Sequence, residues 1–142
     1  MQPVYPTREA ILAYRPNAPP QLMELLLAWK ADIWLPHGRK KSNPSKYLAI
    51  SLLVQKIATD IYRKPVTIEY WPNLQRGPCY EIQRQRIILT DPLSIISGLH
   101  ELGHHLFGTS ELEACGFAVH LFKDAFPKAY EKLRWEGHLL KR

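Results

Sequence analysis

The chain has 142 residues, of which 46% are hydrophobic and 23% charged, a balance that supports one compact core and excludes a disordered protein. No stretch approaches the roughly eighteen uninterrupted apolar residues of a membrane-spanning helix. The net charge of +6 comes from 19 Lys and Arg that cluster only at residues 39–41 and near the C-terminus. We interpret them as solvated surface and expect no nucleic-acid site.

Two features predict a cytoplasmic protein. The N-terminus lacks the basic segment, apolar run and cleavage site of a secretory signal. The chain has two cysteines, Cys79 and Cys115, which are too few for a disulfide scaffold and suit a reducing compartment.

The first part of the chain predicts an arm followed by two helices. Five prolines in residues 1–20 predict an extended arm, and residues 21–142 are expected to form a single domain. Apolar residues at helical spacing predict a helix over residues 21–35. After a loop rich in helix breakers, a second helix is expected over residues 45–62, with Ser45 as its cap.

The middle of the chain predicts a small sheet. Residues 66–71 are rich in β-branched and aromatic side chains, and residues 79–83 and 86–90 alternate apolar and polar side chains. Because only Arg84 and Gln85 separate the last two segments, we expect them to form an antiparallel hairpin. The sheet should therefore have three strands and be mainly antiparallel.

The last third predicts three helices. The pair Asp91 and Pro92 is a typical helix start, which places the first of these helices at Pro92. Gly108 should end this helix in a left-handed conformation. Further helices are expected over residues 111–126 and 128–140, so the predicted fold class is α+β.

Residues 100–104 read His-Glu-Leu-Gly-His, the H-E-x-x-H pattern. Two histidines four residues apart project from the same face of a helix and can hold one Zn²⁺ ion. The glutamate next to the first histidine lies beside the metal, where it can accept a proton from water and pass it on. The pattern predicts a zinc site with His100 and His104 as ligands and Glu101 as general base and acid.

A catalytic zinc site needs a third protein ligand and one open position. If the next helix folds back antiparallel after Gly108, Glu113 lies opposite His104, whereas Glu111 lies beyond the metal. Glu113 is therefore the expected third ligand, although with Ser110 it also fits a capping box that would serve only the helix end. The alternative ligands are Glu111, Cys115 and His120. Cys115 is otherwise expected to be a buried, inert thiol.

Three side chains are candidate hydrogen-bond donors to the oxyanion of a tetrahedral intermediate: Tyr80, His105 and His120. His105 follows His104 directly but is rotated from it by about 100°, so it should not share the metal. We expect His105 to be exposed at the surface.

The strand at 86–90, the motif at 100–104 and the sequence Glu-Leu-Glu-Ala-Cys-Gly-Phe-Ala at 111–118 together resemble the core of ImmA/IrrE-type zinc metallopeptidases. The resemblance covers about residues 45–126. It implies a small zincin-like domain in which N-terminal helices and a sheet precede the active-site helix and a glutamate-bearing helix.

The resemblance also implies site residues and a substrate. By the family pattern, His100, His104 and Glu113 bind zinc and Glu101 is the catalytic residue. The implied substrate is a protein, such as a helix-turn-helix transcriptional repressor of a phage or mobile element. The chain departs from the pattern in its short spacing from His104 to Glu113 and in Cys115, where the family usually has asparagine.

Two alternative functions come from different classes. The first is a catalytically silent module that keeps the zincin shape and binds a protein partner, which the short spacing and the proline-rich arm favour. The second is a SprT-like, DNA-associated peptidase with His100, His104 and His120 as ligands, which the basic charge would suit.

Overall fold

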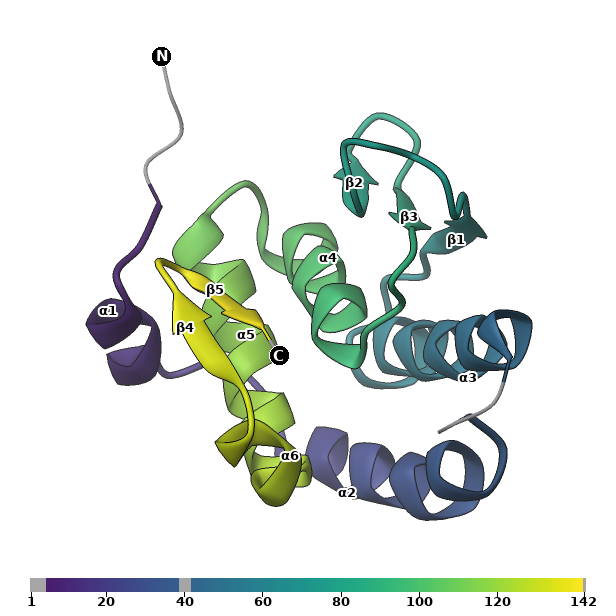
Figure 1. Cartoon of the computed structure of the whole chain (residues 1–142), viewed down its shortest axis with the longest axis horizontal. Coiled ribbons are helices and arrows are strands. Elements are labelled where there is room, and N and C mark those ends of the chain that lie inside the picture. The colour runs from purple at the N-terminus through teal and green to yellow at the C-terminus, as the bar shows by residue number, and fades with distance from the viewer. Residues whose placement is uncertain (1–4, 39–41, 142) are drawn as a thin grey trace.

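The computed structural model describes residues 5–38 and 42–141, so the basic cluster at 39–41 and the first residues of the arm lie outside the described residues. It has a mixed α+β architecture (Figure 1). No helix in the described ranges has both the length and the apolar character needed to cross a membrane. The helical elements are α1 (Arg8–Ala13), α2 (Pro20–Trp29), η1 (Lys30–Gly38), α3 (Asn43–Lys56), η2 (Ile57–Ile61), α4 (Ile95–Phe107), α5 (Glu111–Ala125) and α6 (Pro127–Glu131). The strands are β1 (Thr67–Tyr70), β2 (Cys79–Glu81), β3 (Arg86–Leu89), β4 (Arg134–Glu136) and β5 (Leu139–Lys141).

The first sheet has the strand order β1-β3-β2. Strand β2 is antiparallel to β3, which confirms the predicted hairpin, but β1 is parallel to β3. The expectation of a mainly antiparallel sheet is therefore wrong. Strand β3 is the central strand, and Ile87, Ile88 and Leu89 are almost completely buried, so both faces of this strand are covered.

The main core lies between this sheet and helices α2 to α5. Ile87 and Leu89 of β3 belong to it, together with Leu99 and Leu102 of α4. Since side chains alternate along a strand, Arg86 points to the other face of the sheet. The site helix α4 packs on the face of the sheet that carries Ile87, Leu89 and Tyr80.

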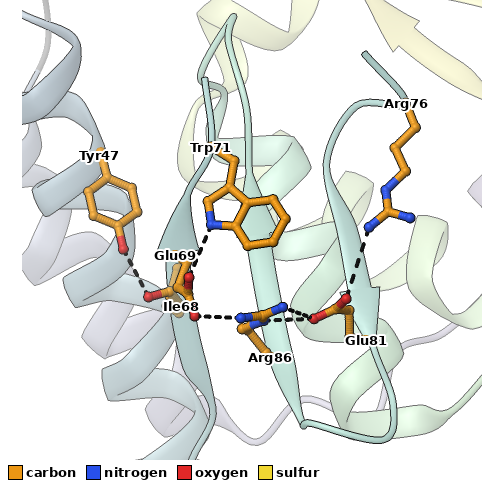
Figure 2. Close-up of polar contacts among 7 residues, drawn as sticks. All are labelled: Tyr47, Ile68, Glu69, Trp71, Arg76, Glu81 and Arg86. Carbon is orange, nitrogen blue, oxygen red and sulfur yellow. Dashed lines mark hydrogen bonds and ion pairs between the residues drawn. The ribbon is translucent and has the colours of Figure 1, made fainter. Parts of the chain in front are cut away.

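Arg86 links all three strands on the opposite face (Figure 2). Its Nη1 donates to Glu69 Oε2 of β1 at 2.7 Å, and its Nε donates to Glu81 Oε1 of β2 at 2.7 Å. The indole Nε1 of Trp71 donates to Glu69 Oε1 at 3.0 Å. Because each strand contributes one charged group, a slip in register would separate the pairs.

The first two predicted helices are present, with different boundaries. The helix expected over residues 21–35 ends at Trp29 and continues as the π-helical segment η1. Ser42, and not Ser45, caps α3, because the Ser42 Oγ accepts a hydrogen bond from the backbone N–H of Ser45 at 3.4 Å.

Helix α4 starts three residues later than predicted. Ser94 is its cap, with its Oγ accepting a hydrogen bond from the Ser97 N–H at 3.1 Å. Asp91 has a different role: its carboxylate accepts a hydrogen bond from the Tyr70 hydroxyl at 2.5 Å. Gly108 ends the helix with a φ of 100°, which confirms the predicted stop.

Both ends of the chain differ from the sequence expectation. Within the predicted extended arm, residues 8–13 form helix α1, whose Ile11 is fully buried against α5. The prediction of a helix over residues 128–140 is also wrong. The chain there forms the short helix α6 and the hairpin β4–β5, and this hairpin turns at Gly137, which has a φ of 62°. Trp135 and Leu140 face each other across this hairpin and pack with α1 on α5.

Gly116 determines how closely α1 approaches α5. A Cβ at Gly116 would lie 2.2 Å from Tyr14 Cδ1 and 2.9 Å from its Cγ. We expect Gly116→Val to displace Tyr14 and destabilise the docking of α1 by about 1–3 kcal/mol. Limited trypsin digestion followed by mass spectrometry should then show faster cleavage after Arg8. Cleavage at the parent rate would contradict this role of Gly116.

Candidate metal site

Helix α4 presents the H-E-x-x-H motif as the sequence predicts. The rings of His100 and His104 lie next to each other, with centroids 4.9 Å apart. The Nδ1 of His104 lies 2.9 Å from the carbonyl oxygen of Gly108. Since a carbonyl only accepts hydrogen bonds, this Nδ1 carries a proton, which leaves Nε2 as the nitrogen of His104 that could bind a metal.

Glu111, the first residue of α5, contacts both histidines. One carboxylate oxygen lies 2.8 Å from the Nε2 of His104 and the other lies 3.3 Å from the Nε2 of His100. All three side chains are 15–21% exposed. They therefore form a group with access to solvent at the junction of two helices.

The expected position of Glu113 against His104 is wrong. The helices meet at the level predicted from the turn, since a Cβ at Gly103 would lie 2.8 Å from the Cα of Ala114. Residues two apart on a helix point in directions about 200° apart, so Glu111 and Glu113 cannot both face α4. The rotation of α5 about its own axis decides which of the two does. With Ala114 facing α4, Glu111 also faces α4 and Glu113 points away.

Glu113 lies instead on the side of α5 that faces α1. Its backbone N–H donates to the Ser110 Oγ at 3.2 Å, which is the bond of the capping box in which the Ser110 side chain takes part. Burial, and then the nearby carboxylate of Glu113, raise the pKa of Tyr14 on that side.

His120 is also remote from the motif, because its Nε2 donates to the carbonyl oxygen of Ile11 at 3.0 Å. The structure therefore brings neither Glu113 nor His120 to the histidines of the motif.

The carboxyl group of Glu101 is buried beside the two histidines. Burial raises the pKa of Glu101 to about 7, although the nearby His100 and His104 act in the opposite direction. A group with this pKa can both accept and donate a proton near neutral pH.

His100 and Glu111 stabilise each other's charged forms. The hydrogen bond from His100 holds the pKa of Glu111 well below its usual range. Burial lowers the pKa of His100, but its contacts with Cys115 and Glu111 outweigh burial and raise it. The side chains of the group are thus attracted electrostatically to one another.

Tyr80 and His105 bond to each other. The Nε2 of His105 lies 2.8 Å from the carbonyl oxygen of Lys64, so it carries the proton. The Nδ1 of His105 must then accept the hydrogen bond from the Tyr80 hydroxyl, which lies 2.8 Å away. His105 is 2% exposed, so the expectation of an exposed side chain is wrong. Burial lowers the pKa of His105.

A cleft of about 440 Å³ opens over the group. His100, Glu101, His104 and Glu111 form its floor, and β2 with the residues on either side of it forms one wall. Within the described residues β2 pairs only with β3, so its outer edge has free backbone groups. The side chain of Ile82, just after β2, is 64% exposed at this wall.

Two side chains that the sequence offers only as alternatives to Glu113, Glu111 and Cys115, are the ones that contact the motif histidines. Cys115 is buried, as expected, but its Sγ lies 3.7 Å from the Nδ1 of His100. The signal that could have found both is the i, i+4 spacing from Glu111 to Cys115, which places them on one face of α5.

Comparisons of the chain with protein-family models, curated proteins and solved structures find no match.

Proposed function

We propose that the chain is a zinc-dependent metalloendopeptidase with a zincin-like fold of the ImmA/IrrE type. The observation that carries this proposal is the carboxylate of Glu111, which lies against the Nε2 atoms of both motif histidines. His100, His104 and Glu111 are the proposed ligands. Glu101 is the proposed general base and acid.

The donor set fits zinc. Two imidazoles and one carboxylate are a common ligand set of catalytic zinc sites, which leave a further position open. Ligand atoms of tetrahedral zinc lie about 3.4 Å apart, because each is about 2.1 Å from the metal. The distance of 3.3 Å between His100 Nε2 and Glu111 is close to this separation, whereas the 2.8 Å between His104 Nε2 and Glu111 is shorter and has the length of a hydrogen bond.

Zinc in this site would supply a Lewis acid that acidifies water and polarises the scissile carbonyl group. Glu101 takes a proton from the attacking water and returns it to the leaving nitrogen of the cleaved peptide bond. Glu101 lines the cleft together with the two histidines, so both transfers can occur at one place. Its pKa of about 7 suits both roles.

The substrate we propose is an extended segment of a protein. Residues of β2 line the cleft, and the free edge of this strand can pair with such a segment as an added strand. The exposed Ile82 offers an apolar contact next to this edge. A helix-turn-helix repressor in the cytoplasm is the substrate that the family resemblance suggests.

One observation favours a second candidate, a zinc-binding module without catalysis. Tyr80 and His105 donate their protons to His105 and Lys64 respectively, and His120 bonds to α1. None of the three side chains therefore has a proton directed at the cleft. Retained zinc without cleavage of unfolded proteins would support this candidate over the peptidase.

Zinc content tests the proposed site. We expect about one zinc per chain in the parent protein after dialysis, measured by elemental analysis, and a large loss in Glu111→Ala because a ligand is missing. Glu113→Ala is the matched control, since it removes a carboxylate from the same turn of α5 that does not contact the histidines. This control should retain the zinc of the parent.

Two outcomes would contradict the assignment. Loss of zinc in Glu113→Ala, with Glu111→Ala unchanged, would transfer the third ligand to Glu113. A folded parent that takes up no added zinc would overturn the peptidase proposal itself.

A further inference from the structure

Cys115 lies between the two helices that carry the proposed ligands. Its Sγ is 3.7 Å from the Nδ1 of His100 on α4 and 3.9 Å from Oε2 of Glu111 on α5. The residue is 3% exposed, so its thiol is almost completely shielded from solvent.

The two nitrogens of His100 have different partners. Nε2 faces Glu111 at 3.3 Å, whereas Nδ1 faces Cys115. A thiol can accept a hydrogen bond from an N–H and donate its own S–H to a carboxylate. Cys115 can therefore hold the proton of His100 on Nδ1 and at the same time direct the carboxylate of Glu111.

His104 has a corresponding partner, the carbonyl oxygen of Gly108 on its Nδ1. Both histidines are thus oriented by an acceptor on Nδ1, which leaves Nε2 of each directed at Glu111. Such outer partners fix the tautomer and the ring orientation of histidine ligands, and their loss commonly weakens metal binding by about 10–100-fold.

We propose that Cys115 is a positioning residue of the zinc site, which orients His100 and Glu111 without binding the metal. This inference rests on the proposed function, because it assigns a role toward the same site. The thiol faces the Nδ1 of His100, whereas the proposed metal-binding atom is Nε2. The thiol would be a ligand if His100 bound the metal through Nδ1, because the ligand atoms of His100, Glu111 and Cys115 lie within 4.8 Å of one another.

The test compares zinc affinities of the full chain by competition with a chromophoric chelator, using Zn²⁺ alone. Cys115→Val keeps a similar volume but removes the hydrogen-bonding sulfur, so we expect about 10–100-fold weaker zinc binding. Cys115→Ser restores a group that donates and accepts, and it should recover most of the loss. Val119→Ala is the control for packing, because Val119 lies one turn further along α5 in the same buried cluster.

The outcomes separate this inference from the proposed function. Equal zinc affinity in the parent, Cys115→Val and Val119→Ala would overturn the positioning role while leaving the peptidase proposal intact. Cobalt substitution gives a second readout, since a thiolate ligand produces an intense near-ultraviolet charge-transfer band. A band present in the parent and lost in Cys115→Val would make Cys115 a metal ligand and overturn the inference. A parent that binds no zinc would instead overturn the proposed function.

Discussion

Replacing Glu101 by glutamine is expected to lower the rate of peptide cleavage by about 10²–10⁴-fold while zinc stays bound. Glutamine keeps the size of the side chain but cannot accept a proton from water. Burial disfavours the charged carboxylate of Glu101, as its pKa of about 7 indicates, so the neutral amide should not unfold the chain. The measurement is release of labelled fragments from an unfolded protein, together with zinc content by elemental analysis.

Chelation provides the control for this experiment. Cleavage by the parent should disappear when a chelator removes zinc and return when zinc is added back, which ties the measured activity to this site. A Glu101→Gln chain that cleaves at the parent rate would contradict the catalytic assignment. A parent that binds zinc and cleaves no unfolded protein would favour the binding module.

Gly103→Ala is expected to reduce the free energy of unfolding by about 1–3 kcal/mol and to weaken zinc binding as well. The new Cβ would lie 2.8 Å from the Cα of Ala114, and a backbone atom cannot turn aside as a side chain can. The helices α4 and α5 must then separate. Since the motif histidines lie on α4 and Glu111 lies on α5, the separation also pulls the ligand set apart. Denaturant unfolding and zinc competition measure the two effects.

Gly98→Ala is the matched control, because Gly98 also lies inside α4. Its Cβ would approach the Cγ2 of Ile50 at 2.9 Å and that of Val54 at 3.4 Å, which are ends of side chains on α3. Both substitutions raise helix propensity by a similar amount, up to about 1 kcal/mol. We expect Gly98→Ala to retain zinc affinity. Parental stability and zinc affinity in Gly103→Ala would show that the two helices tolerate a wider spacing.

Local sequence signals predicted the elements that depend on local chemistry. The hairpin of β2 and β3 follows from alternation, and α5 follows from the cap at Ser110 and the proline after its end. The C-terminal segment was predicted wrongly because its apolar residues fit helical spacing as well as strand alternation. Packing on Ile11, a residue far away in sequence, favours the hairpin, and no local pattern reports such a contact.

The part of the site that lies on a single helix, α4, could be predicted from the sequence. Residues 100–104 define both histidines and the buried glutamate, since their relative positions follow from helix geometry alone. The third side chain comes from another helix, and its identity depends on the rotation of that helix about its own axis. Residues 114–119 of α5 are buried without a break, so hydrophobic patterning does not reveal this rotation.

The contact between α1 and α5 also has a consequence for biosynthesis. The hydrogen bond from His120 to Ile11 joins residues 109 positions apart. At about 5–20 residues per second, the ribosome needs about 5–20 s to make the intervening chain, so α1 emerges long before its partner exists. Its apolar side chain Ile11 must stay in water, or with a chaperone, until α5 appears. Closure of the N-terminal segment is therefore a late event of folding, after the helix that carries the motif has been made.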